Sequence, residues 1–397
     1  MVDNKQLIQE KLAQAVEILN EFEIDAWVIF TRETFMLPDP IMDLLVGLNV
    51  TWQSAFIITR TGRKIAIVGY YDGDSVRGLD VYEVRTYHHG VGPALRETIE
   101  EINPQKIALN YSEMDVASDG LTFGMYRNLC RYLAGTPYIE RFVSSERVIA
   151  ALRGRKSDTE VARVRQAVAS TAAIFDAVEA YVRPGMTQIE IAAFVKEQIE
   201  SKGLDYAWDP KYNPIVTCGP NSGIGHAVPG NTVLERGHTL HLDLGVREND
   251  YCSDIQRMWY VLKEGEESAP PDVERAFDVV LGAIKVGEKA LKPGVLGWEV
   301  DKVAREFIVD NGYPEYMHAF GHLLGRSAHD GATVLAPRWE KYQGICDLPV
   351  EVGNIFTLEL HVVVAGRGIM SLEEDVLVGE DEVIYLGEPQ TELRYIR

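Results

Sequence analysis

Two aspartates that can face each other across a hairpin are the first residues that could do chemistry. The segment HTLHLDLGVRENDYCSDIQRMWYV (238–261) predicts two strands around a polar turn. If the turn is centred at 248–249, Asp243 lies opposite Asp254, with Cβ atoms about 5 Å apart on one face. Two carboxylates among apolar neighbours repel each other unless they share a proton or a cation. The pair therefore indicates a cation site, and two exposed turn acids are the equally weighted alternative.

A second pair of acids repeats this arrangement nearer the C-terminus. In IFTLELHVVVAGRGIMSLEEDVLV, strand patterns flank the turn sequence AGRG. Glu359 and Glu373 are symmetric about Gly366, so they too can face each other. Glu374 and Asp375 are competing candidates for the second position. Two hairpins that each present facing acids favour a metal site more strongly than one hairpin does.

Histidines are concentrated in one glycine-punctuated segment, YMHAFGHLLGRSAHDG. His318, His322 and His329 fall within twelve positions of it. His226 is a fourth candidate, on the predicted loop CGPNSGIGHAVPG. A single buried histidine is usually a hydrogen-bonded core residue. Three in one segment indicate a site instead, because imidazole is the commonest metal ligand and titrates near neutral pH.

Together these residues offer four carboxylates and one imidazole, a hard donor set rich in oxygen. Such a set suits two bridged divalent ions and favours manganese, iron(II) or cobalt over a sulfur-rich structural zinc site. Two ions about 3.5–4 Å apart can bridge a water, lower its pKa and polarise a carbonyl. The flanking histidines would then hold the substrate and stabilise the developing oxyanion.

Alternating helix and strand patterns predict an α/β fold that positions this site in the second of two domains. Apolar residues recur at helical spacing over 4–22, and the strand patterns DAWVIF, SAFIITR and KIAIVG follow. A helix is predicted at 93–103, before the strand KIALN. This first part, 1–153, contains no glycine-rich phosphate loop, and its His88-His89 pair is typical of an exposed loop.

The segment Gly-Arg-Lys is the predicted boundary to the second domain, 154–397. Ser157 or Asp158 is the predicted N-cap of a long helix, and Glu160 completes a capping box if Ser157 takes that role. The helix should run to about Tyr181, where a Pro-Gly pair ends it, and a second amphipathic helix (QIEIAAFVKEQIESKG) follows. The hairpins and the histidine segment all come after these helices.

Charge and composition exclude several classes of partner. The 397 residues include 60 Asp and Glu against 39 Lys and Arg, a formal net charge of −21. A field of that sign repels phosphate backbones and anionic lipid surfaces. No apolar stretch approaches the ~18 residues that span a bilayer, and the N-terminus resembles an amphipathic helix and not a signal peptide. The four cysteines have no CxxC spacing, so we expect a cytoplasmic protein without a disulfide scaffold, nucleic acid or membrane.

The order of the candidate ligands resembles that of a known family. An aspartate, a second one eleven residues on, then histidine, glutamate and glutamate is similar to the pita-bread metallopeptidases. These include methionine aminopeptidase, aminopeptidase P, prolidase and the non-metal creatinase. MHAFGHLLGRSAHD resembles the His-x3-His-x6-His-Asp segment of aminopeptidase P and prolidase. The resemblance implies a creatinase/prolidase-type N-terminal α/β domain over 1–153 and a pseudo-twofold pita-bread catalytic domain over 154–397, usually in dimers.

The resemblance also assigns a role to each candidate. It implies five metal ligands: Asp243, Asp254, His322, Glu359 and Glu373. Within this set Asp254 and Glu373 bridge the ions, and Glu359 also carries the proton during catalysis. It further implies that the other histidines bind substrate and take part in catalysis by stabilising the oxyanion: His226, His318 and His329.

Two positions depart from the family's pattern. The family usually has Glu-Pro-Gly at the fourth ligand, where this chain has Glu359-Leu360-His361. Prolidase-like members commonly carry an arginine two residues before the last glutamate, where this chain has Ser371. That arginine helps to organise the site, so His361 or Arg367 is a candidate substitute. His361 is accordingly a candidate substrate-binding residue, with a simple strand residue as the alternative.

The whole pattern predicts a metal-dependent Xaa-Pro peptidase, either a dipeptidase or an aminopeptidase. Two Mn²⁺ ions are expected, with Co²⁺, Zn²⁺ or Fe²⁺ as alternatives, and a homodimer acting on small peptides. One alternative keeps the fold and hydrolyses a small non-peptide amide or C–N substrate, as creatinase and ectoine hydrolase do. Another is a binding module on an inactive peptidase fold, similar to histone-chaperone relatives. The intact ligand positions favour the peptidase.

Overall fold

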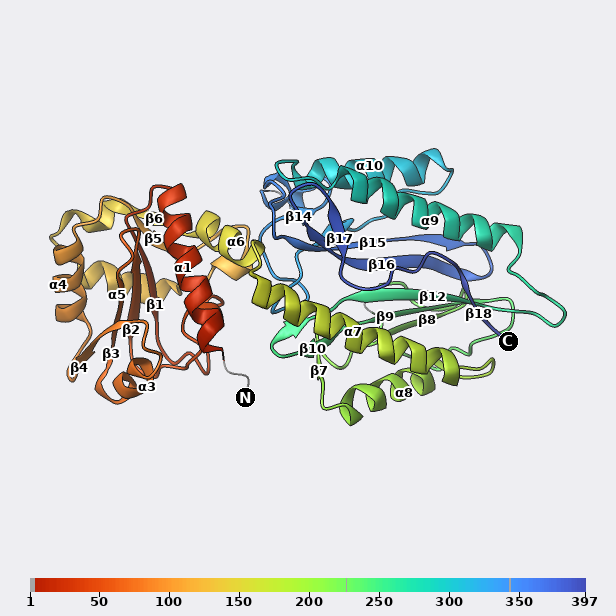
Figure 1. The fold of residues 1–397 in the computed structure, drawn as a ribbon, viewed down its shortest axis with the longest axis horizontal. Coiled ribbons are helices and arrows are strands. Elements are labelled where there is room, and N and C mark those ends of the chain that lie inside the picture. Colours follow the sequence, from red (N-terminus) through yellow and green to blue (C-terminus); the bar gives the residue numbers. More distant parts are fainter. Residues whose placement is uncertain (1–3, 226, 343) are drawn as a thin grey trace. The chain divides into compact units, whose positions relative to one another are not determined.

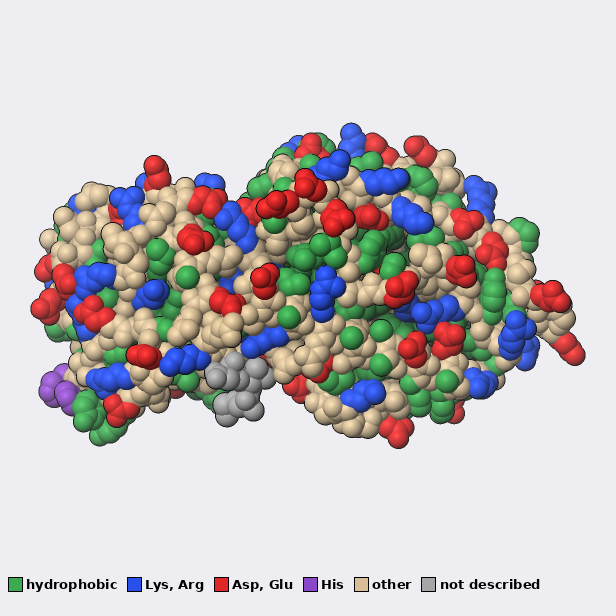
Figure 2. Space-filling model, viewed as in Figure 1, with side chains coloured by type: hydrophobic (Ala, Val, Ile, Leu, Met, Phe, Trp, Pro, Cys, Tyr) green, Lys and Arg blue, Asp and Glu red, His purple; other side chains and the backbone are tan. Residues whose placement is uncertain are grey.

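The computed structural model describes residues 4–225, 227–342 and 344–397 and confirms the predicted mixed α/β class (Figure 1). The chain divides into two compact units, Met1–Arg153 and Gly154–Arg397, which are described separately. Across the described ranges, no helix combines the length and apolarity needed to cross a bilayer. On the face shown in Figure 2, acidic side chains lie among basic ones and form no continuous acidic field.

The first unit is built on a six-stranded sheet with the order β4-β3-β2-β1-β5-β6. Its strands are β1 (Ala26–Thr31), β2 (Ser54–Thr59), β3 (Lys64–Gly69), β4 (Glu83–Tyr87), β5 (Ile107–Leu109) and β6 (Phe142–Ser144). Its helices are α1 (Lys5–Glu21), α2 (Met42–Leu45), α3 (Gly73–Arg77), α4 (Gly92–Ile102), α5 (Phe123–Tyr132) and α6 (Glu146–Gly154). Trp27 and Ile29 pack in the same core as α1, whereas Val28 and Phe30 pack with α4 and α5. The sheet is buried on both faces, which explains continuous apolar runs such as DAWVIF.

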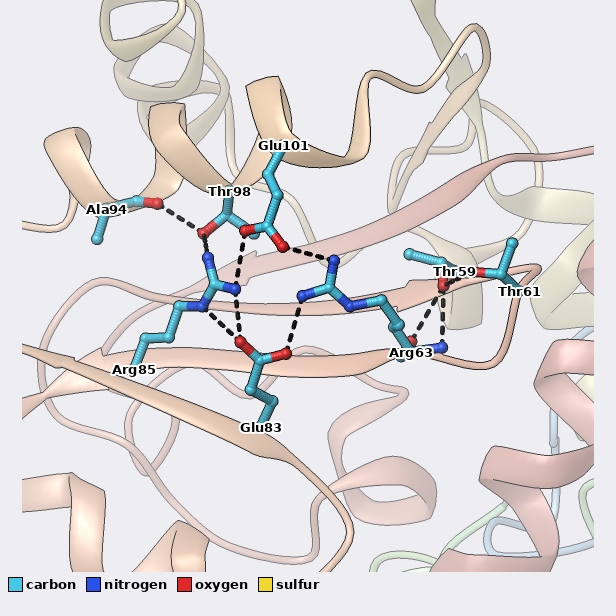
Figure 3. A network of polar contacts seen from close by, with 8 residues as sticks. All are labelled: Thr59, Thr61, Arg63, Glu83, Arg85, Ala94, Thr98 and Glu101. Atoms are coloured by element: carbon cyan, nitrogen blue, oxygen red, sulfur yellow. Dashed lines mark hydrogen bonds and ion pairs between the residues drawn. The ribbon is translucent and has the colours of Figure 1, made fainter.

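An ion-pair network fastens the edge strand β4 to α4 (Figure 3). Arg63 donates to Glu101 Oε1 and Glu83 Oε2, both at 2.8 Å, and Arg85 contacts the same two acids. Arg85 also donates to Thr98 Oγ1 of α4 at 2.8 Å. Hydrogen bonds from the two arginines lower the pKa of Glu83 and of Glu101. Charged side chains on an edge strand also discourage pairing with another chain.

The second unit contains the predicted site and is built on a seven-stranded sheet. Its main path is β15-β16-β12-β9-β8, with β17 paired to β16 and β18 paired to β12. These strands are β8 (Ile215–Cys218), β9 (Thr239–Leu244), β12 (Ile255–Val261), β15 (Ile355–Val364), β16 (Gly368–Val378), β17 (Val383–Tyr385) and β18 (Arg394–Ile396). Two smaller sheets consist of β7 (Asp205–Tyr206), β10 (Val246–Glu248) and β11 (Tyr251–Cys252), and of β13 (Gly321–His322) and β14 (Val334–Leu335).

Helices cover one face of the large sheet: α7 (Asp158–Tyr181), α8 (Gln188–Ser201), α9 (Pro271–Ala290) and α10 (Gly297–Asp310). The predicted capping box of α7 is confirmed, because Ser157 Oγ accepts from Glu160 N while Glu160 Oε2 accepts from Ser157 N. Helix α7 packs along β10, β11 and β12, and α9 packs along β15 and β16 (Figure 1). Trp259 of β12 contacts Phe175 of α7. Side chains alternate along a strand, so the residues directly before and after Trp259 point to the face opposite the helices.

Both predicted hairpins form, and the second has the predicted register. Glu359 of β15 lies opposite Glu373 of β16, as the symmetry about Gly366 predicted. The prediction for the first hairpin was wrong, since Asp243 of β9 lies opposite Gln256.

The turn explains the difference in the first hairpin. Asn249 and Asp250 both have positive φ, 49° and 69°, which is the backbone of a two-residue type I′ turn. The turn is therefore centred one residue later than predicted. Asp254 lies two residues before Gln256, so it keeps its place on the same face of the sheet as Asp243.

Candidate metal centre

Backbone pairing aligns the predicted carboxylate ligands across four neighbouring strands. Gln256 of β12 lies opposite Asp243 on one side and Glu373 on the other, and Glu373 lies opposite Glu359. Asp254 precedes Gln256 by two residues and so shares this face. All four acids therefore lie on the face that the helices leave free.

His322 is brought to these acids by a segment that runs beside β15. Phe320 O accepts from Glu359 N at 2.8 Å, and His322 N donates to Thr357 Oγ1 at 3.3 Å. The Nε2 atom of His322 lies 3.8 Å from Asp254 Oδ2, 3.8 Å from Glu359 Oε1 and 3.9 Å from Glu373 Oε1. Three carboxylate oxygens, one each from β15, β16 and the residue directly before β12, thus surround one imidazole nitrogen at nearly equal distances.

This spacing fits a shared cation. Atoms that bind one ion at about 2.1 Å lie about 3–4 Å from one another. Candidate ligand atoms of Asp254, His322 and Glu373 all lie within 4.8 Å of each other. Asp243 Oδ1 is buried and has no hydrogen-bond partner among the described residues. The donor set, one nitrogen and four carboxylates, is suited to hard divalent ions.

Burial raises the pKa of all four carboxyl groups, and repulsion between the acids raises it further at Asp254, Glu359 and Glu373. Burial raises the pKa of Asp243 to about 7, and burial with the charge of Asp243 raises the pKa of Glu359 to about 8. The pKa values of Asp254 and Glu373 lie well above the ordinary range, through burial and then the charges of Asp243 and Asp254 respectively. Burial lowers the pKa of His322 to about 3, which keeps it in the neutral form that binds metal.

The competing acids of the second hairpin have other partners. Glu374 points to the opposite face, where its oxygens accept from Arg257 at 2.9 and 3.0 Å. Asp375 Oδ2 accepts from the backbone N of Asp254 at 3.1 Å, and burial raises the pKa of Asp375 well above its usual range. Of the three consecutive acids, Glu373 is the one that lies beside His322.

A cavity of about 580 Å³ opens onto the ligands. It is lined by the five predicted ligands together with His329 and Trp208, Asp209, Tyr212, Ile215 and Ala328. The ring of His329 lies 4.3 Å from that of His322, at an angle of 65°. Sequence reasoning missed Trp208, Asp209 and Tyr212, because their segment has neither a metal-ligand pattern nor a clear periodicity.

The other predicted histidines are placed differently. His318 Nε2 lies 3.1 Å from His361 Nδ1, with the rings 10° from parallel, and His318 Nδ1 lies 2.7 Å from Ala319 O. Neither ring is among the described residues that line the cavity. Burial lowers the pKa of His318 to about 4 and also lowers that of His361. His226 lies outside the described residues, and the roles of these histidines stay predictions.

The structure also shows what occupies the positions that depart from the family's pattern. Ser371 is buried, and its Oγ lies 2.5 Å from Gln256 Oε1. Arg367 pairs with Asp272 at 2.7 Å beside the hairpin turn and does not line the cavity. Gln256 was missed by sequence reasoning, although its position two residues after Asp254 in a strand pattern placed it on the ligand face.

Replacing Gly321 with alanine should displace His322. A Cβ at this position would lie 1.9 Å from the backbone oxygen of Thr357, an atom that β15 holds in place. We expect a loss of about 1–3 kcal/mol of stability and at least tenfold weaker Mn²⁺ binding, measured by thermal unfolding and metal titration. Gly124 is the matched control, since a Cβ there meets nothing within 4 Å. Unchanged Mn²⁺ affinity in Gly321→Ala would contradict this account.

Similar proteins share this architecture. An uncharacterized peptidase of Staphylococcus saprophyticus is 26% identical over 342 residues, 84% of this chain and 91% of the relative. The structure of a Xaa-Pro dipeptidase from Bacillus anthracis matches with a TM-score of 0.74 and 22% identity, over 98% of this chain and 100% of that one. The N-terminal domain of FACT complex subunit SPT16 from Cicer arietinum also matches, with a TM-score of 0.67 and 13% identity over 96% of each chain. Proteins with different names thus share this fold, so the likeness of the structures shows the fold alone.

A family model decides the membership. The model of metallopeptidase family M24 matches residues 162–380, a range that includes both hairpins, the histidine segment and all five predicted ligands. This range is more than half of the chain. The chain belongs to metallopeptidase family M24.

Proposed function

We propose that this chain is a metal-dependent peptidase that cleaves Xaa-Pro peptides in a site with two divalent ions. The observation that carries the proposal is the convergence of Asp254, Glu359 and Glu373 on His322 Nε2 at the wall of one cavity. The volume of this cavity, about 580 Å³, is within the range of small-molecule sites. The printed name of the Bacillus anthracis protein, a Xaa-Pro dipeptidase, supports the substrate class.

The residues divide the chemistry between them. When bound, divalent ions supply a water of lowered pKa and polarise the scissile carbonyl. Glu359, which lines the cavity beside His322, can take a proton from the attacking water and pass it to the leaving nitrogen. His329, in the cavity wall, donates to the oxyanion, while His318, paired with His361 and not among the described lining residues, stays a predicted substrate-binding residue. His226 is the third predicted substrate-binding histidine.

The charges of the cavity wall favour the aminopeptidase form of this activity. Among the described lining residues there is no lysine or arginine, and Asp209 adds a fifth acid. A dipeptide must place its free carboxylate close to the scissile bond, where that acid repels it. A longer peptide carries its carboxylate away from the site, and its protonated N-terminus is attracted.

Metal reconstitution tests the proposal. The chain is stripped with a chelator, and hydrolysis of a Xaa-Pro dipeptide and a Xaa-Pro-Xaa tripeptide is measured before and after Mn²⁺ is added. We expect Mn²⁺ to restore cleavage of the bond before proline, and the tripeptide to be cleaved faster. Equal product from stripped and metal-loaded protein would show that the peptidase proposal is wrong.

The departures from the family's pattern support a second candidate. With Leu360-His361 and Ser371 in place of the usual residues, a small amide or C–N substrate, as in creatinase or ectoine hydrolase, is the alternative. A panel of Xaa-Pro peptides against small cyclic and guanidino compounds separates the two. We further propose Mn²⁺ as the ion, ahead of Co²⁺, Zn²⁺ and Fe²⁺, and a cytoplasmic homodimer, which metal analysis and sedimentation can test.

A further inference from the structure

Gln256 lies in the middle of the row of acids. Its strand, β12, is central in the sheet, and its direct neighbours are Asp243 on β9 and Glu373 on β16. Glu359 is one strand further along the same row. The side chain is 6% exposed. The residue between the carboxylates of Asp243 and Glu373 is thus a neutral amide, and not a charged or an apolar side chain.

Every hydrogen-bonding position of this amide is used. Its Nε2 donates to Glu373 Oε2 at 2.8 Å and to Glu359 Oε2 at 3.1 Å. Its Oε1 lies 2.5 Å from Ser371 Oγ and 2.8 Å from His241 Nε2. An amide has two N–H donors and two acceptor lone pairs, so the four contacts satisfy it completely.

The partners also fix which way the amide points. The ring nitrogen of His241 that faces the amide oxygen is Nε2. His241 Nδ1 is buried with no partner among the described residues. The proton therefore belongs on Nε2, where it is donated to the amide oxygen. The NH₂ group must then face the two glutamates.

The contacts leave a specific oxygen of each glutamate for an ion. Gln256 holds Oε2 of Glu359 and Oε2 of Glu373, while Oε1 of each lies 3.8 and 3.9 Å from His322 Nε2. We propose that Gln256 is a positioning residue, oriented by Ser371 and His241, that turns the free oxygen of both glutamates toward the metal ion. This inference rests on the proposed function only in that the site binds a divalent ion.

The test replaces the amide with a side chain of similar shape and no donors. The full-length chain is stripped and titrated with Mn²⁺ alone, and free Mn²⁺ is followed by its electron paramagnetic resonance signal. We expect Gln256→Met to weaken Mn²⁺ binding about 10–100-fold, as loss of a group that orients metal ligands does. At saturating Mn²⁺, the kcat of Gln256→Met should approach the wild-type value. At limiting Mn²⁺, its kcat/KM should stay further below the wild-type value.

Gln390 offers a matched control in the same unit. It is 3% exposed, its Oε1 accepts from Met258 N at 2.9 Å, and its Nε2 donates to Met258 O at 2.8 Å. Gln390→Met should lower thermal stability while leaving Mn²⁺ affinity within about twofold. If both variants lose affinity equally, the effect comes from core damage and the inference fails.

Ser371→Ala provides a milder variant. It removes one bond to the Gln256 amide, so we expect a loss of affinity of roughly three- to tenfold. Adding Ser371→Ala to Gln256→Met should cause no further loss of Mn²⁺ affinity, because Ser371 acts through Gln256. Unchanged Mn²⁺ affinity in Gln256→Met and Ser371→Ala would overturn the inference, as would a wild-type chain that binds no Mn²⁺. A wild-type chain that binds Mn²⁺ without cleaving Xaa-Pro peptides would overturn only the proposed function.

Discussion

Replacing Asp254 with asparagine should lower kcat/KM for a Xaa-Pro peptide by at least about a thousandfold. Asp254 Oδ2 lies 3.8 Å from His322 Nε2, and the side chain is also hydrogen-bonded to that of Asp243. Asparagine has a similar shape but lacks the negative charge that a ligand of a divalent ion would supply. Mn²⁺ affinity, titrated on the same protein, should fall together with activity.

The stability of this variant separates lost chemistry from lost folding. In metal-free protein Asp254 is a buried acid that is repelled by Asp243, Asp375 and Glu359. Asparagine is neutral at every pH and adds no charge to the cluster, so stripped Asp254→Asn should unfold at the same temperature as wild type or higher. Asp272→Asn is the control, because Asp272 is half-exposed and pairs with Arg367 away from the cavity. Full activity in Asp254→Asn would remove Asp254 from the ligand set.

The two hairpins show how far local patterns predict a site. The second register was predicted correctly, because the turn sequence around Gly366 is symmetric about one glycine that has φ of +71°. The register of the first hairpin differs from the predicted one, because Asn249 and Asp250 adopt the left-handed backbone of a type I′ turn and so move the centre of the turn by one residue. The displacement changed the partner of Asp243 by two residues, which preserves the face of the sheet. A change of one residue would have turned every side chain to the other face.

The elements that position the remaining residues depend on contacts that the sequence pattern does not contain. His322 reaches the acids because Gly321 allows its backbone to approach β15, a strand more than thirty residues later. The pairing of His318 with His361 joins residues 43 positions apart. Periodicity predicts which face a side chain takes, but not which distant segment covers that face. The assignment of 1–153 as a creatinase-type domain likewise stays a prediction.

Metal-free protein should lose stability as the pH rises from 7 to 9. The folded state raises the pKa of Asp243 from 3.8 to about 7 and that of Glu359 from 4.5 to about 8, chiefly through burial. The folded state binds these protons more tightly than the unfolded chain does. Their contribution to the free energy of unfolding is therefore complete below the unfolded pKa. It is lost as the pH rises through the folded pKa. Above pH 7 the unfolded chain has already released both protons, so the loss from pH 7 to 9 is limited to the protons that the folded groups still hold, roughly 0.3 pKa unit for Asp243 and roughly 1 for Glu359. One pKa unit is about 1.4 kcal/mol, so the two groups together should cost on the order of 2 kcal/mol between pH 7 and 9.

Saturating Mn²⁺ should reverse this dependence, because an ion must displace the same protons and binds more tightly as they leave. Urea unfolding at pH 6, 7, 8 and 9, with chelator or with excess Mn²⁺, measures both curves. Calorimetric titration in two buffers of different ionisation enthalpy should show protons released on Mn²⁺ binding at pH 7. Asp254→Asn should flatten the chelated curve, since it removes one of the acids whose pKa the folded state raises. A chelated wild-type curve that is flat from pH 7 to 9 would show that the four acids do not share one buried, cation-dependent site.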